Sequence, residues 1–277
     1  MTKLLSANLA RLRRDTIFWL VAAAVLLSSL AAAFNHVYSA SAMIASGYFV
    51  TADDYFFSTA PMMGLFCAVF ISLFLGTEYG DGAVRNKLTV GHRRDSIYLA
   101  GFLSVFLGNL VFLAVWLLGS VPTLLLIGPL EMGLRGFLVY VLIAVGFTAV
   151  LSAVFTAVGH LSSNKAITVV LTLLVWLVLL FAASAIDGRL CEPELQSSIM
   201  MTANGIEMLD PEPNPLYLSG AARQVAEFLR DLLPTGQAIL MSDAVIEHPL
   251  RQILCSIGLT ALVTAGGVLC FRRKDLK

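Results

Sequence analysis

Six long apolar stretches divide this chain, and none of them contains Asp, Glu, Lys, Arg or His. They cover residues 17–34, 56–76, 97–121, 137–159, 166–186 and 253–271. About 20 apolar residues in a helix cross a bilayer core of about 30 Å. Backbone groups in lipid must bond within their own structure, and continuous rather than alternating apolar runs favour helices over barrel strands. The sequence therefore predicts an all-α membrane protein with six transmembrane helices.

The lack of charge inside these stretches bears on the energy source of any transport. Carriers that are driven by ions or protons usually place carboxylates, Lys or His within their spans. Here the spans hold only neutral polar groups such as Asn109. If the protein moves a solute uphill, we expect the energy to enter from outside the membrane.

The net charge is zero, but the basic residues gather on one predicted side of the membrane. They are Lys3, Arg11, Arg13, Arg14, Arg85, Lys87, Arg93, Arg94, Lys165, Arg272, Arg273, Lys274 and Lys277. Short loops rich in Lys and Arg stay in the cytoplasm. Both the N- and C-termini are therefore predicted to be cytoplasmic.

Two segments outside the spans have helical patterns of their own. Leu5, Leu9 and Leu12 repeat at helical spacing within residues 1–16, which predicts an amphipathic interfacial helix; a simple basic tail is the alternative. Residues 187–251 form a long, acidic segment on the predicted outer side. It is predicted to be an extracellular helical cap, and the chain as a whole, residues 1–277, a single transmembrane domain.

Within that cap, one helix is predicted between Ser219, which can cap its start, and Pro234, which ends it. Its apolar face contains Val225, Phe228, Leu229 and Leu232, and a second short helix is predicted over residues 235–246. The apolar run from 97 to 128 is too long for one span, and its Gly and Pro residues predict a span followed by a short returning or interfacial piece.

No pattern for catalysis or metal binding is present. The sequence has no G-x-x-x-x-G-K-[ST] phosphate loop and no H-E-x-x-H, its four histidines are dispersed, and Asp81 has no second intramembrane aspartate to pair with. We therefore expect no enzyme activity and no cofactor on this chain. A disulfide between Cys191 and Cys255 is left open, because no framework of paired cysteines exists.

The most informative segment follows the second span and reads GTEYGDGAVRNKLTVGHRRDSIYLA, residues 76–100. Glu78 and Tyr79 stand where the helix leaves the membrane, Gly80 and Gly82 allow a sharp turn, and a short basic amphipathic element follows until Gly91. Spacing alone also fits an ordinary basic loop that only sets the topology.

This segment resembles the signature of type-two ABC transporter permeases, the six-span membrane subunits of bacterial ABC exporters. That signature is E-Y-x-x-G-T, then a short basic helix, then a basic residue before the third span. Glu78, Tyr79 and Gly82 match it, whereas Ala83 stands in place of the usual Thr. The C-terminal FRRKDLK (residues 271–277) and NPLYLSG (residues 214–220) are also similar to bacterial members that export drugs and peptides.

The resemblance implies that residues 78–96 form a cytoplasmic coupling segment, which docks on a separate ABC ATPase subunit. The implied coupling residues are Glu78, Tyr79, Gly82, Arg85, Asn86, Lys87, Arg93 and Arg94. Glu78 would anchor the junction through hydrogen bonds or a basic partner, and the Arg and Lys residues would contact the ATPase or lipid phosphate. The short inner loop at residues 162–165 would add a minor contact.

The resemblance also implies the partners and the location of the protein. Two copies of the ATPase would hold ATP and Mg, and a second permease subunit, identical or homologous, would complete the pathway. The protein would lie in the bacterial cytoplasmic membrane, in contact with the lipid bilayer and not with nucleic acid. Its cargo would be an amphipathic drug, an antimicrobial peptide or a lipid-like molecule.

Alternative functions follow from the same topology. The chain could be a non-transporting membrane scaffold or sensor without an obligate ATPase, or a secondary carrier driven by an ion gradient; an intramembrane enzyme ranks last. Two spans carry small residues at four-residue spacing, which fits either packing within the subunit or a subunit interface. These residues are Ala24, Ser28 and Ala32 in the first span and Ser256, Thr260 and Thr264 in the sixth.

Overall fold

The apolar stretches form six long helices in the part of the chain that the computed structural model describes, which is all residues except 163, 197–198, 203–204, 209 and 275–277. The helices are α2 (Thr16–Ala45), α4 (Met63–Gly80), α6 (Arg94–Gly119), α8 (Gly133–Leu161), α9 (Lys165–Leu190) and α12 (Pro249–Arg273). Each is long and apolar enough to cross a membrane; for α4 and α6 this includes the short helices next to them. The described residues therefore contain six candidate membrane-spanning helices, the number that the sequence predicts.

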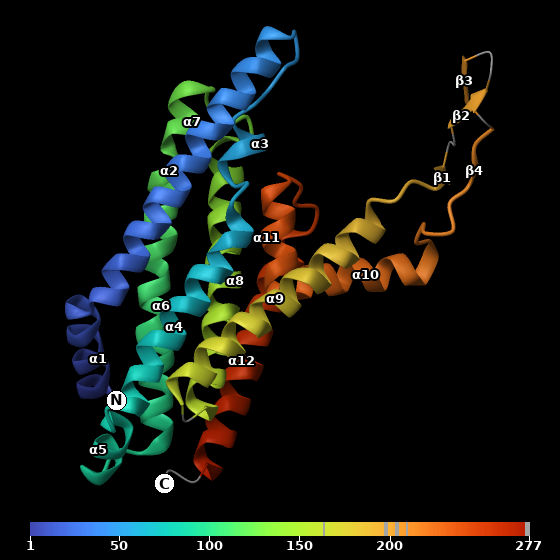
Figure 1. Cartoon of the computed structure of the whole chain (residues 1–277). Coiled ribbons are helices and arrows are strands. Elements are labelled where there is room, and N and C mark those ends of the chain that lie inside the picture. Colours follow the sequence, from blue (N-terminus) through green and yellow to red (C-terminus); the bar gives the residue numbers. More distant parts are fainter. Residues whose placement is uncertain (163, 197–198, 203–204, 209, 275–277) are drawn as a thin grey trace.

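Shorter helices connect or flank the long ones. They are α1 (Thr2–Arg14), α3 (Asp53–Phe56), the 3-10 helix η1 (Ala60–Met62), α5 (Ala83–Thr89), α7 (Val121–Leu126), α10 (Gly220–Leu232) and α11 (Pro234–Ser242). The N-terminus and the end of α12 lie at the same end of the bundle, as does α5 (Figure 1). We call this the basic end, after Arg85, Arg93, Arg272 and Arg273; its cytoplasmic location stays a prediction.

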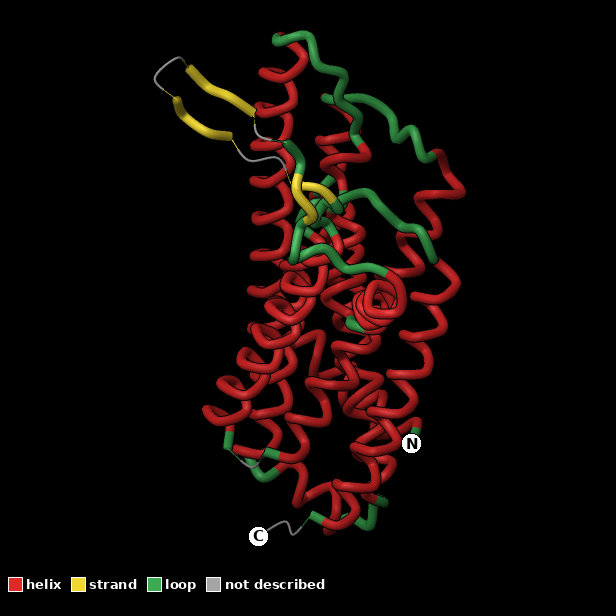
Figure 2. The backbone as a smooth tube through the Cα atoms, turned by 90° about the vertical axis from the view of Figure 1, so that its right-hand side faces the viewer, coloured by secondary structure: helices red, strands yellow, loops and turns green. Residues whose placement is uncertain are grey.

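Helix α8 lies at the centre of the bundle and contacts α4, α6, α9, α11 and α12. Most of the long helices run roughly along the same axis (Figure 2). Aromatic side chains fill the space between them, and Phe70, Phe74, Phe112 and Phe147 are fully buried. Each buried aromatic ring packs a large apolar area against the neighbouring helices. This core therefore fixes how the ends of the helices lie relative to one another.

Two predicted boundaries are wrong in position. The first helix continues to Ala45, so it is longer than the predicted span 17–34 and residues 35–45 are helical. The second long helix, α4, begins at Met63 and not at residue 56. Pro61 lies in the first turn of η1, and this break separates α4 from α3. Hydropathy marks the apolar part of a helix but not the end of the helix itself.

The predicted break in the third apolar run is present, but the chain does not turn back. Helix α6 ends at Gly119 and α7 begins at Val121, with Pro122 in its first turn, where no backbone N–H is needed. In Figure 1, α7 continues toward the end opposite the basic end. Helix α7 is therefore not a returning piece but continues the direction of α6, packed against α2; an interfacial location stays a prediction.

The segment after α9 contains strands that the sequence analysis did not predict. β1 (Leu195–Gln196) pairs with β4 (Glu212–Pro213), and β2 (Ile199–Thr202) pairs with β3 (Gly205–Met208), both antiparallel. The β2–β3 hairpin projects away from the bundle (Figures 1 and 2). The protein is therefore mostly helical rather than all-α. Parts of this segment, 197–198, 203–204 and 209, lie outside the described residues.

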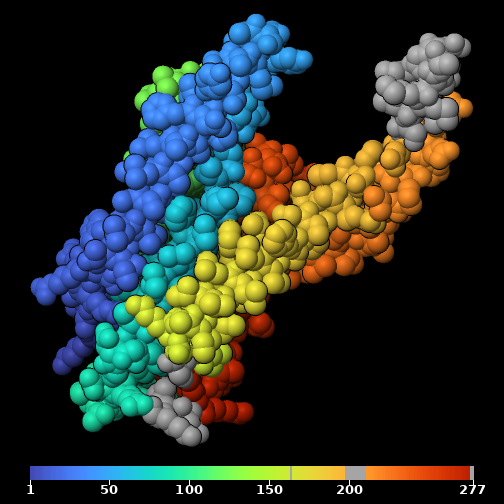
Figure 3. All heavy atoms as spheres, in the orientation of Figure 1, coloured from blue at the N-terminus to red at the C-terminus, as the bar shows by residue number. Residues whose placement is uncertain are grey.

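Helices α10 and α11 form where two helices were predicted, and most of the predicted apolar face of α10 points outward in this subunit. Its apolar Val225, Phe228 and Leu229 are exposed in this subunit, while Arg230 and Asp231 pack toward α9 and α12. The Ser219 side chain makes no capping hydrogen bond. Together α9 and α10 form an arm that diverges from the bundle (Figure 3). The extracellular location of this region stays a prediction.

The four cysteines are all free, so Cys191 and Cys255 do not form the disulfide that the sequence analysis left open. Cys191 lies just after α9 and is exposed, whereas Cys255 is half-buried in α12. The connection between α9 and α12 is therefore held by packing and polar contacts.

Gly236 is required at the sharp turn between α10 and α11. A Cβ atom added there would lie 2.2 Å from the carbonyl oxygen of Arg230, which belongs to the backbone and cannot swing aside. We expect Gly236→Ala to lower the free energy of unfolding in detergent by about 1–3 kcal/mol, a typical cost of overpacking. Gly258→Ala in α12 is the control, because nothing lies within 4 Å of its new Cβ. Equal losses in both variants would contradict the expectation.

Candidate functional site

Two glycines shape the turn that carries the candidate site. Gly82 (φ 67°) precedes α5 and Gly91 (φ 92°) follows it, and both adopt a left-handed conformation that residues with a side chain rarely take. Gly80 is the last residue of α4 and is helical, so the predicted sharp turn depends on Gly82. The glycines set α5 as a separate seven-residue helix between α4 and α6.

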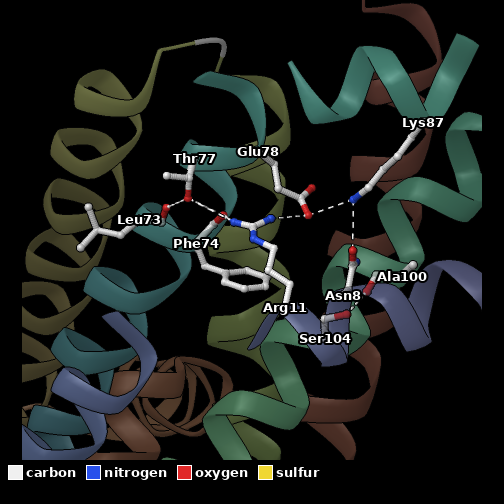
Figure 4. A network of polar contacts seen from close by, with 9 residues as sticks. All are labelled: Asn8, Arg11, Leu73, Phe74, Thr77, Glu78, Lys87, Ala100 and Ser104. Atoms are coloured by element: carbon white, nitrogen blue, oxygen red, sulfur yellow. Dashed lines mark hydrogen bonds and ion pairs between the residues drawn. The ribbon is translucent and has the colours of Figure 1, made fainter. Parts of the chain in front are cut away.

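Glu78 lies at the end of α4 and is almost completely buried, with 2% of its side chain exposed. Its Oε1 atom lies 2.7 Å from Nη1 of Arg11 and 2.9 Å from Nζ of Lys87 (Figure 4). The two cations come from α1 and α5. One buried carboxylate therefore joins three helices, and it has the basic partners that the sequence analysis expected.

Arg11 and Lys87 make further contacts around this carboxylate. Arg11 donates from Nη2 to the carbonyl oxygen of Phe74 (2.6 Å) and to Oγ1 of Thr77 (3.1 Å), and its guanidinium lies over the Phe74 ring. Lys87 donates to Oδ1 of Asn8 at 3.1 Å (Figure 4). We call Asn8, Arg11, Glu78 and Lys87 the Glu78 cluster. Its charges are paired and bonded, as buried charges must be.

Helix α1 is packed onto the bundle along one row of side chains. Leu4, Asn8 and Leu12 are buried, and α1 contacts α6. The sequence analysis assigned the apolar face to Leu5, Leu9 and Leu12; the buried row is shifted because Asn8 and Arg11 bond to the α4–α5 turn. Whether α1 also lies at the membrane interface stays a prediction.

Tyr79 extends the connection to α8 and to the C-terminal tail. Its hydroxyl donates to the carbonyl oxygen of His160 at 2.9 Å and lies 3.1 Å from Nδ1 of the same residue. Lys274 donates to the carbonyl oxygens of His160 (2.9 Å) and Ser162 (3.0 Å), and its ammonium lies over the Tyr79 ring. Burial lowers the pKa of Lys274 from its usual value. The end of α4 is thus bonded to four segments of the chain.

Arg94 has a structural partner that the sequence analysis did not expect. Its Nη1 atom donates to carbonyl oxygens at the end of α12: Phe271 (3.2 Å), Arg272 (2.9 Å) and Lys274. A cation at this position satisfies carbonyl groups that have no partner within the helix and interacts favourably with the helix dipole. Arg94 therefore holds α12 to the start of α6 instead of facing outward.

The predicted coupling residues thus divide into two groups. Glu78, Tyr79, Lys87 and Arg94 bond to other segments of the subunit, and Gly82 sets the turn. The exposed group contains Arg85, Asn86 and Arg93. The expectation that all four predicted cations face a partner or lipid is thus revised for Lys87 and Arg94. Of the other predicted contacts, residue 163 of the inner loop and 275–277 of the C-terminal string lie outside the described residues.

Sequence reasoning missed three residues of this site. Asn8 was not singled out, Arg11 appeared only among the basic residues that set the topology, and His160 only as one of four dispersed histidines. Asn8 could have been noticed, since a polar residue midway between Leu4 and Leu12 on one helix face needs a partner if that face is buried. His160 gave no comparable signal, because it ends an apolar helix in the same way as many solvent-exposed residues do.

The fold and this turn define a multi-pass helical membrane protein in which one end of the bundle presents a short basic helix. Residues 4–183 match the family model described as ABC-2 family transporter protein, and the chain belongs to this family. The family is the transmembrane component of ABC transporters, which supports a permease subunit that works with an ATPase partner. The match includes the whole Glu78 cluster and ends before α10. No curated protein matches the sequence.

Proposed function

We propose that this chain is the permease subunit of a bacterial ABC exporter in the cytoplasmic membrane. It couples ATP hydrolysis by two copies of a separate ATPase subunit, which bind ATP and Mg, to export of an amphipathic drug, an antimicrobial peptide or a lipid-like molecule. A second permease subunit, identical or homologous, completes the pathway. The helix that meets the ATPase is α5, within residues 78–96.

The observation that carries this proposal is the burial of Glu78 between Arg11 and Lys87. A helix as short as α5 is marginal by itself in water and transmits no force unless it is fixed to the bundle. Removing one partner of a buried ion pair costs about 3–5 kcal/mol. A displacement of α5 by the ATPase would therefore move α1 and α4 with it.

The exposed side chains of the basic end supply the surface for docking. Arg85 and Asn86 project from α5, and Arg93 precedes α6 with 81% of its side chain exposed. Two exposed guanidinium groups beside a short helix suit an acidic groove on the partner, although that of Arg93 also contacts Asp95 at 3.5 Å. Exposed ion pairs contribute only about 0–1 kcal/mol each, so several such contacts must act together.

The proposed docking is tested by reversing charge at two exposed residues. We expect Arg85→Glu combined with Arg93→Glu to weaken binding of the ATPase roughly tenfold or more, because each attraction becomes a repulsion of about 1 kcal/mol or more. The measurement is the amount of ATPase that co-purifies from native membranes in mild detergent, and its ATP hydrolysis.

The matched control reverses Arg13 and Arg14, which are also exposed basic residues but lie at the far end of α1. Both variants must reach the membrane in wild-type amounts, which shows that the topology is kept. Wild-type ATPase recovery with the Arg85/Arg93 variant would contradict docking at α5. If no ATPase co-purifies even with the wild-type chain, the proposed function itself is contradicted, in favour of a scaffold or sensor.

A further inference from the structure

A long apolar groove lies on the side of the bundle formed by α6, α8 and α12. Its volume is about 830 Å³, within the usual range for ligand sites. Its walls include Phe102 of α6, Gly146 and Ala149 of α8, and Ala261 and Ala265 of α12. The groove is open to the side, and in a membrane it would face the lipid.

The groove follows α12 for most of its length. Its lining begins at Ile253 and ends at Arg272, about 28 Å apart at 1.5 Å per residue, which is close to the thickness of a bilayer core. Small side chains on α12 and α8 keep it hollow. The hydroxyls of Thr260 and Thr264 are buried there and have no hydrogen-bond partner among the described residues. The shape suits extended hydrocarbon chains.

The groove has one charged end. Among the described residues that line it, Arg272 is the single charged one, and 52% of its side chain is exposed. Arg272 uses Nε and Nη2 on the carboxylate of Asp95, at 2.5 and 2.6 Å, which engages two of the five N–H donors of a guanidinium. Arg93 contacts the same carboxylate at 3.5 Å, and the exposed Arg273 is next in the chain. Two cations contact one carboxylate and a third is adjacent in the chain, so the described residues at this end attract a further negative charge.

A second copy of the chain fits this face less well. In a dimer with its twofold axis along the membrane normal, equivalent residues meet at the same depth. The Arg272 clusters of the two copies would then approach each other with like charge. A lipid has the opposite character, because its apolar chains fill the groove while its phosphate meets the arginines.

We propose that this groove, the α12 groove, binds one phospholipid with an anionic headgroup. Its acyl chains lie along Ala261 and Ala265 between α12 and α8, and its phosphate is bound by Arg272 and Arg93. The bound lipid joins α12 to α6 at the basic end, where α12 also receives the Arg94 hydrogen bonds. The site shares Arg93 with the proposed ATPase contact, so its test changes Arg272 and leaves Arg93 in place.

The test is a titration of delipidated protein in neutral detergent, followed by the midpoint of thermal unfolding. The probes are phosphatidylglycerol, phosphatidylcholine with the same acyl chains, and glycerol phosphate without chains. We expect phosphatidylglycerol to raise the midpoint at a lipid fraction about tenfold lower than phosphatidylcholine does, with no shift from glycerol phosphate. Equal potency of the two lipids, or a full shift from glycerol phosphate, would overturn the proposal.

Variants distinguish lipid binding in the α12 groove from non-specific lipid binding elsewhere on the protein. Arg272→Gln should remove the preference for phosphatidylglycerol, and Ala261→Phe, which fills the groove, should remove the response to both lipids. Ala23→Phe, at an exposed alanine of α2, is the control for added bulk and should respond like the wild type. A change in oligomeric state with Ala261→Phe, without a change in the lipid response, would identify the groove as a subunit contact and overturn the proposal.

Asp95→Asn excludes an indirect effect of Arg272 through its ion pair. If Arg272 acts only by pairing with Asp95, both Asp95→Asn and Arg272→Gln remove the lipid preference. If Arg272 binds the phosphate, Asp95→Asn frees the guanidinium and the preference for phosphatidylglycerol is kept or increased. Loss of the preference in Asp95→Asn would therefore count against the proposal.

Discussion

Glu78→Ala is expected to lower the free energy of unfolding by about 3–5 kcal/mol and to uncouple ATP hydrolysis from transport. The variant leaves Lys87 and Arg11 next to each other without the carboxylate that both contact. Removing one partner of a buried pair leaves an uncompensated charge, which is the reason for the large cost. Thermal unfolding in detergent measures the first effect. Hydrolysis and export by the reconstituted complex measure the second.

Asp81→Asn is the matched control, because Asp81 lies three residues later in the same turn and its side chain is exposed. It should keep both stability and transport. Glu78→Gln tests the charge separately from the volume and should lie between wild type and alanine. Transport at the wild-type rate by Glu78→Ala, at normal expression, would exclude the coupling role of the Glu78 cluster.

Double-mutant cycles show which of the two helices the carboxylate mainly holds. Cycles of Glu78→Ala with Arg11→Met and with Lys87→Met report the coupling to α1 and to α5. A strong coupling to Arg11 would mean that α1 moves with the α4–α5 turn. A strong coupling to Lys87 alone would confine the effect to the turn.

The spans could be predicted from the sequence because a single physical requirement sets them. An apolar run of about 20 residues without charge has few alternatives to crossing the bilayer. The ends of the helices were less predictable. Residues 35–45 contain Asn, His and Ser, so hydropathy places them outside the membrane, yet their backbone continues the helix to Ala45. Polar surroundings do not end a helix; a proline or a cap does.

The candidate site was predictable in kind but not in its contacts. The E-Y-x-x-G pattern singled out Glu78, Tyr79 and Gly82 on the basis of a resemblance. The partners Arg11 and His160 come from other helices, and only the packing of α1 on α6 and of α8 on α4 brings them into reach. The number of basic residues at one end shows that ion pairs can form, but not which cations remain free.

Helix α10 shows where pattern reasoning fails for a physical reason. An amphipathic helix is normally expected to turn its apolar face inward. Here the adjacent Arg230 and Asp231 both have opposite charges within reach on the inner side, Asp187 at the end of α9 and Arg251 in α12. These pairs turn the charged face inward and leave Val225 and Phe228 outside. The positions of the partners are not visible in the pattern of α10 itself.

Asp231 is therefore expected to be the second position of large effect. Its carboxylate, 3% exposed, accepts from Arg251 and, at 2.9 Å, from Nε2 of Gln252. Gln237 donates to the Asp231 carbonyl oxygen at 2.7 Å and accepts from Ser256 at 2.9 Å. We expect Asp231→Ala to lower the free energy of unfolding by about 3–5 kcal/mol, because Arg251 and the buried Gln252 both lose a partner.

The same helix provides the control for this prediction. Glu227 pairs with Arg223 one turn earlier at 3.1 Å, with 36% of the arginine side chain exposed, and Glu227→Ala should cost only about 0.3–0.5 kcal/mol. Asp231→Asn, which keeps an acceptor for Gln252, should lie between the two. Comparable losses in Asp231→Ala and Glu227→Ala would show that the Asp231 pair does not hold α10 to α12. In that case the inward charged face of α10 would need another cause.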